Sequence, residues 1–135
     1  MKLDEKGRFA PPPPLPRFAQ QLSEALAQVP NVQARTHWQL GDESVVDGAD
    51  FYFGDEELGH LHLDAEAHVA QVKPIRDALI AAGHAKPFRW SREFVTAPVE
   101  KQADVKHVRW LFELRRKQLE GTPVADLLKE ISQSG

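Results

Sequence analysis

Three histidines in the middle of the chain have the clearest capacity for chemistry. His60, His62 and His68 lie in the run ELGHLHLDAEAHV, residues 57–69, which contains no lysine or arginine. Neutral imidazole binds zinc well, and it also suits nickel and copper. Three imidazoles with an open fourth position form the ligand set of many catalytic zinc sites. His60, His62 and His68 are therefore a candidate set of metal ligands.

The elements that carry these histidines decide whether they meet. The segment 58–63 is typical of a strand, in which residues two apart share a face, so His60 and His62 point the same way. The face of His68 depends on the turn that follows. A three-residue loop at 64–66 sets His62 opposite His68, so that all three imidazoles converge, whereas a two-residue loop turns His68 to the other face. The sequence leaves both registers open.

Three interpretations of this hairpin follow: a metal site, a metal-free polar pocket, and an exposed sheet face. In the first, a carboxylate such as Glu57 or Asp64 would orient a ring through its second nitrogen. In the second, a small molecule would bind among convergent polar groups. The candidate ligand-binding residues are His60, His62, Glu57, Arg76 and Trp90.

The sequence does not identify a reaction. It contains no Gly-x-Ser-x-Gly elbow, no P-loop and no Gly-x-Gly-x-x-Gly run. Hydrolysis at a histidine-bound zinc or nickel ion is a third hypothesis, and it requires the metal first. Whether the chain is an enzyme stays open.

Composition favours one ordinary globular domain. The 135 residues include no cysteine, which excludes disulfides and thiolate ligands. Neither a membrane-length apolar run nor a signal-peptide core is present, so we expect a cytoplasmic protein without membrane partners. Residues 42–66 hold nine acidic residues and no basic one. That acidic middle argues against nucleic acid as a partner.

The remaining periodicities predict an α+β domain. Helical spacing appears at 18–29 and 74–82, and two-residue alternation at 32–40. Asp47-Gly48 predicts a tight turn, with short strands after it. A long helix is expected at 101–119, followed by a short one. We therefore predict a two-layer fold, with helices on one face of an antiparallel meander of about four to six strands.

The two ends of the chain carry further expectations. Residues 1–14 end in four prolines and are predicted to be a flexible leader, with 15–135 forming the single domain. The long helix has apolar residues around a wide arc, including Trp110 and Leu114. The short terminal helix is the simplest cover for that arc. The alternative function is a protein–protein interaction module, or a homodimer, that uses the long helix.

Three segments resemble the luciferase-domain family: FYFGDEELGHLHLDAEAHV, then VKPIRDALIAAGHAKPFRW, then FVTAPVEKQADVKHVRWLFELRRKQL. The resemblance extends over about residues 28–119, and its most specific element is Glu57 to His62. It implies an α+β domain. It transfers no catalytic residue and no cofactor.

Overall fold

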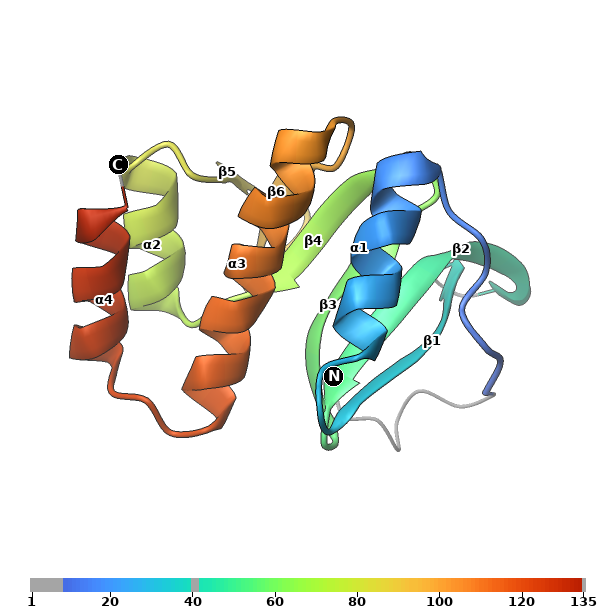
Figure 1. The fold of residues 1–135 in the computed structure, drawn as a ribbon, viewed down its shortest axis with the longest axis horizontal. Helices are drawn as coiled ribbons and strands as arrows, with labels where there is room; N and C mark the ends of the chain where they lie inside the picture. The colour runs from blue at the N-terminus through green and yellow to red at the C-terminus, as the bar shows by residue number, and fades with distance from the viewer. Residues whose placement is uncertain (1–8, 40–41, 135) are drawn as a thin grey trace.

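The fold is a six-stranded antiparallel sheet with a layer of helices, as expected from the sequence (Figure 1). A computed structural model describes residues 9–39 and 42–134. The helices are α1 (Arg17–Ala27), α2 (Lys73–Ala81), α3 (Gln102–Leu119) and α4 (Val124–Gln133). The strands are β1 (Val32–Gln39), β2 (Asp42–Phe53), β3 (Glu56–His62), β4 (Glu66–Ala70), β5 (Lys86–Pro87) and β6 (Phe94–Pro98). Their order in the sheet is β1-β2-β3-β4-β6-β5.

The core lies between one face of the sheet and helices α1 and α3. Alternate strand residues point into it, because successive side chains of a strand face opposite ways. Phe51 of β2 packs edge-to-face on Phe112 of α3, with ring centroids 5.9 Å apart. Leu22 of α1 and Leu61 of β3 are fully buried in the same cluster. The residues between these core positions form the second, polar face of the sheet.

The predicted turn at Asp47-Gly48 is wrong. Both residues lie inside β2, which runs unbroken to Phe53. His37 pairs with Gly48 while Trp38 pairs with Val46, so Asp47 is the extra residue of a β-bulge. An Asp-Gly pair suits a bulge as well as a tight turn. In both structures the main chain comes close to the neighbouring strand, and glycine has no side chain to obstruct that approach.

The terminal helix α4 packs along α2 and contacts α3 through Glu130. The indole Nε1 of Trp110 donates to Glu130 Oε2 at 2.8 Å, and Lys117 Nζ lies 2.8 Å from Glu130 Oε1. Leu114 is fully buried. Part of the wide apolar arc of α3 is thus covered within the chain. Homodimer formation stays a prediction.

The segment before α1 lies along the outer edge of β1. The amide of Thr36 donates to the carbonyl of Ala10 at 2.8 Å, and the Thr36 hydroxyl donates to the carbonyl of Pro11. The guanidinium of Arg35 stands 5.0 Å from the centre of the Phe9 ring. The rest of the predicted leader, 1–8, lies outside the described residues.

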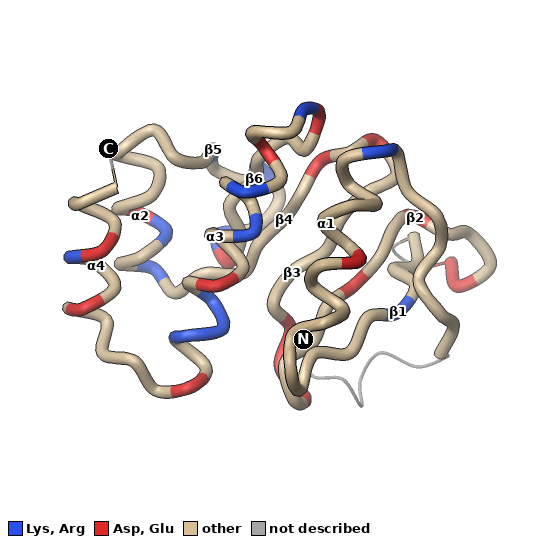
Figure 2. Tube along the Cα trace, in the orientation of Figure 1, with Lys and Arg blue, Asp and Glu red and all other residues tan. Residues whose placement is uncertain are grey.

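Lysine and arginine are interspersed with aspartate and glutamate along α2, α3 and α4 (Figure 2). Within the described part of the chain, none of the helices combines the length and apolarity required to cross a bilayer.

Candidate functional site

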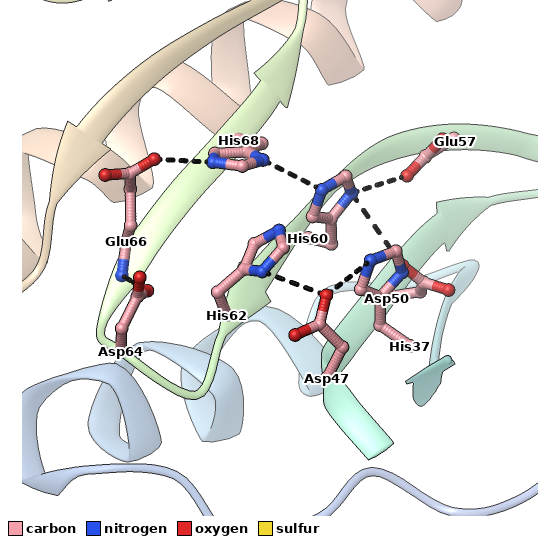
Figure 3. A network of polar contacts seen from close by, with 9 residues as sticks. All are labelled: His37, Asp47, Asp50, Glu57, His60, His62, Asp64, Glu66 and His68. Atoms are coloured by element: carbon pink, nitrogen blue, oxygen red, sulfur yellow. Dashed lines mark hydrogen bonds and ion pairs between the residues drawn. The ribbon is translucent and has the colours of Figure 1, made fainter. Parts of the chain in front are cut away.

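The polar face of the sheet brings together histidines from three strands. Across the sheet, Asp50 of β2 pairs with His60 of β3, and His60 pairs with His68 of β4. Two residues away along the strands, and therefore on the same face, His37 of β1 pairs with Gly48 of β2, and Gly48 pairs with His62 of β3. Cross-strand partners share a face, so four imidazoles lie on one surface (Figure 3).

The hairpin that carries three of them has neither of the two predicted registers. His68 lies opposite His60 rather than opposite His62 or on the other face. The loop is Leu63 to Ala65, closed by a hydrogen bond from Ala65 N to His62 O at 3.0 Å. Ala65 has a φ of 67°, the left-handed conformation expected at the end of a three-residue hairpin loop. The expectation that the three histidines could converge on one face holds, but through this third register.

Glycine makes the close approach of these strands possible. A Cβ on Gly59 would lie 2.4 Å from the main-chain oxygen of His68, and one on Gly48 would lie 2.0 Å from that of Leu61. No other residue type fits at such distances without separating the strands. The histidine strand β3 therefore has a glycine contact on each side.

A chain of hydrogen bonds joins two histidines between two carboxylates. Oε2 of Glu57 lies 3.0 Å from Nδ1 of His60, Nε2 of His60 lies 3.1 Å from Nδ1 of His68, and Nε2 of His68 lies 2.6 Å from Oε1 of Glu66. Glu57, His60 and His68 are buried, whereas the Glu66 side chain is 48% exposed. This series of hydrogen bonds therefore runs from the protein interior to solvent.

The environment of His68 sets the direction of the hydrogen bonds along this series. Burial lowers the pKa of His68, and the hydrogen bond to Glu66 opposes that shift only in part. His68 is therefore neutral near pH 7, with Nε2–H donating to Glu66 and Nδ1 accepting from His60.

A second set of contacts surrounds His37 and His62. Nδ1 of His37 lies 2.8 Å from Oδ1 of Asp50, which is 1% exposed. The bulged residue Asp47 places Oδ2 at 3.2 Å from Nδ1 of His62 and 3.7 Å from Nε2 of His37. The rings of His37 and His60 stack, with centroids 4.2 Å apart and planes 9° from parallel. Each imidazole thus has a carboxylate beside at least one ring nitrogen.

Two groups of residues on this face could hold a metal ion, and one of them contains His37 beside His60 and His62. His37, His60 and His62 each offer a ligand atom, and these atoms all lie within 4.8 Å of one another. Asp50, Glu57 and His60 form a second such group. Nε2 of His62 is buried and has no hydrogen-bond partner among the described residues. His68 adjoins the first group through its contact with His60.

The other sequence candidates lie in different surroundings. Glu57 contacts His60 directly, and Asp64 accepts the amide of Glu66 in the hairpin loop. Arg76 pairs with Asp77 on α2 at 3.2 Å, and Trp90 is 76% exposed beneath the guanidinium of Arg89. Neither Arg76 nor Trp90 is among the residues of the network in Figure 3.

Sequence reasoning missed four members of the network: His37, Asp47, Asp50 and Glu66. Two signals pointed toward them. The alternation at 32–40 placed His37 on the polar side of its strand, and the acidic run 42–66 contained all three carboxylates. What was missing was the bulged register in which β1 pairs with β2, because the alternation within one strand does not fix its register with the next.

Residues 55–115 match the family model of the Luciferase domain. This match confirms the family resemblance seen in the sequence, over a shorter stretch than expected. It includes His60, His62 and His68, and it begins after His37 and Asp50. No curated protein and no solved structure matches the chain.

Proposed function

We propose that the polar sheet face binds a divalent transition-metal ion, zinc or nickel, through His37, His60 and His62. The observation that carries this proposal is the approach of three histidine ligand atoms to within 4.8 Å of one another. Nitrogens around a tetrahedral zinc ion at about 2.1 Å lie about 3.4 Å apart. Small rotations of the rings would bring the three ligand atoms to that spacing.

The carboxylates around the histidines support the proposal. Metal-bound histidines usually donate their second N–H to a carboxylate, which fixes the ring and makes the ligand nitrogen more basic. Asp50 lies 2.8 Å from His37, Glu57 lies 3.0 Å from His60, and Asp47 lies 3.2 Å from His62. Each proposed ligand thus has a carboxylate beside Nδ1 and would bind the ion through Nε2, and His60 would give up its Nε2 hydrogen bond to His68 on binding.

The lone pair of His62 gives independent support. Its Nδ1 lies 3.2 Å from the Asp47 carboxylate, and its buried Nε2 has no hydrogen-bond partner among the described residues. The tautomer protonated at Nδ1 would leave the Nε2 lone pair available to an ion. A buried acceptor without a partner costs about 1–3 kcal/mol. A bound cation would satisfy this atom and offset that cost.

The chemistry such an ion would supply is limited to what three imidazoles leave open. An ion with three protein ligands keeps a position for water or a small molecule and acts there as a Lewis acid. The chain's own contribution is to hold the three rings close together on one face of the sheet. Hydrolysis stays a hypothesis that depends on metal binding.

Metal content tests the proposal directly. Untagged protein would be loaded with zinc or nickel, freed of excess ion and measured by mass spectrometry beside a His62→Ala variant. We expect close to one ion per chain in the wild type and loss of that ion in the variant. His84→Ala is the matched control, because His84 is equally half-buried but lies near His107 and Trp110, outside the network.

Two results would contradict the proposal. One is wild-type protein that retains no ion after loading at neutral pH. The other is an ion that His62→Ala and His84→Ala retain equally, because the ligands would then lie elsewhere. Urea denaturation adds a second measurement, since a free ion at 100 times its Kd should stabilise the wild type by about 2.7 kcal/mol.

A further inference from the structure

A cavity opens beside the histidine network where two strands separate. The pairing of β3 with β4 ends at Gly59 and Val69. Beyond that point β3 continues with β2 as far as Glu56, while β4 continues with β6 as far as Ala70. A cavity of about 490 Å³ lies between the diverging segments and α3. That volume suits a small organic molecule.

Polar side chains fixed by hydrogen bonds form part of its wall. The amide of Gln71, which is 4% exposed, donates to the carbonyl of Leu111 at 2.9 Å and accepts from Gln118 Nε2 at 2.6 Å. Arg115 donates from Nε to the carbonyl of Glu57 at 3.3 Å and from Nη1 to Gln118 at 3.5 Å. These contacts hold the Arg115 guanidinium in place before any ligand arrives. A group held in this way costs less to order on binding.

The lining carries equal numbers of positive and negative groups. Its charged residues are Lys73, Arg92 and Arg115 against Glu56, Glu57 and Glu93. Desolvation lowers the pKa of Arg115, and the three glutamates oppose that shift. A ligand with a single charge gains no net attraction from this balanced lining, because one set of charged groups attracts it and the other repels it. A ligand with one charge of each sign is attracted by both sets.

We propose that this cavity binds a small amino-carboxylate zwitterion. Its carboxylate pairs with Arg115, whose planar guanidinium matches carboxylate geometry. Its ammonium group lies among the carboxylates of Glu56 and Glu93. Val72 and Phe94 provide the apolar surface for the carbon chain between the two charges.

This site goes beyond metal binding and does not depend on it. The two sites share Glu57, whose main-chain oxygen accepts from Arg115 while its carboxylate faces His60. A molecule in the cavity therefore lies one side chain away from the histidines. The cavity wall contains none of the three proposed metal ligands.

Three related probes test the proposal on the full chain without any mutation. They are 6-aminohexanoate, which carries both charges, N-acetyl-6-aminohexanoate, which keeps only the carboxylate, and hexylamine, which keeps only the ammonium. Binding would be measured by calorimetry and by amide shifts in NMR spectra, in the presence of a chelator. We expect the zwitterion to bind at least about tenfold more tightly than either singly charged probe, because each removes one charge-assisted contact. No binding of 6-aminohexanoate, or equal binding of all three, would overturn the proposal.

Matched arginine variants locate the site. Arg115→Gln should weaken 6-aminohexanoate binding at least about tenfold, whereas Arg109→Gln, on the same helix and paired with Glu113, should not change it. Equal affinities in the two variants would place any binding elsewhere. His62→Ala should bind 6-aminohexanoate as the wild type does. Loss of metal in that variant with binding retained would show that the two sites are separate.

Discussion

Replacing Gly59 with alanine tests whether glycine sets the spacing of the histidine strands. The new Cβ would lie 2.4 Å from the main-chain oxygen of His68 and 2.9 Å from the Cα of Val69. Ordinary contacts of this kind start near 3.4 Å, so about 1 Å must be recovered. Both nearest atoms belong to the main chain, so no side-chain rotation can relieve the overlap. β3 and β4 must move apart at this point.

The expected cost follows from that separation. Overpacking in a well-packed region costs about 1–3 kcal/mol. Two ladder hydrogen bonds weakened beside Gly59 add about 1 kcal/mol each. The free energy of unfolding should therefore fall by about 3–5 kcal/mol, a large part of the 5–15 kcal/mol typical of a domain.

Urea denaturation in chelator-treated buffer measures this change, followed by circular dichroism. Gly54→Ala is the control, because a Cβ there meets nothing within 4 Å and only the positive φ of 61° is strained. That control should lose about 1 kcal/mol. The contrary result is that Gly59→Ala lowers the free energy of unfolding no more than Gly54→Ala does, at the same m-value. In that case the close approach of the strands does not exclude a side chain at position 59. The explanation of how His60 and His68 are brought together would then fail.

Two further predictions concern titration and helix docking. Burial lowers the pKa of His68 in the folded state, so the unfolded chain binds the proton first as pH falls below about 6.5, and the free energy of unfolding should fall between pH 7.5 and 5.5. In urea-denaturation series over this range, His68→Asn should reduce that fall. A pH dependence that is the same in wild type and His68→Asn would contradict the prediction. Glu130→Gln should destabilise the protein by about 1 kcal/mol, because it removes the negative charge of the carboxylate that accepts from Trp110 and Lys117. The control Lys129→Gln should change the thermal unfolding temperature little. Equal effects of the two variants would show that the Glu130 contacts contribute nothing to stability.

The predictions that depended on local periodicity were confirmed. The α+β class, the antiparallel sheet and the long helix followed from spacings that are visible within ten to twenty residues. The shared face of His60 and His62 needed only the two-residue period of a strand. These features depend on neighbouring residues, so a single sequence contains them.

The site itself depended on strand registers, which the alternation within a single strand does not fix. His37 joins the network because β1 pairs with β2, and Asp47 joins it because the bulge turns its carboxylate toward His62. The hairpin register depended on Ala65 adopting a left-handed conformation, which alanine rarely does. Periodicity does not report any of these, since each is fixed by the packing of the whole sheet.

The hydrogen bond from Thr36 to Ala10 has a consequence for how copies of the protein meet. A sheet of this kind has two open edges, and an unpaired edge strand can add a strand from another molecule and begin aggregation. At β1 the amide of Thr36 is already bonded to Ala10, and Phe9 lies beside Arg35. At the opposite edge β5 is only two residues long, and its second residue, Pro87, has no amide hydrogen to donate. Both edges thus resist the addition of a further strand from another molecule.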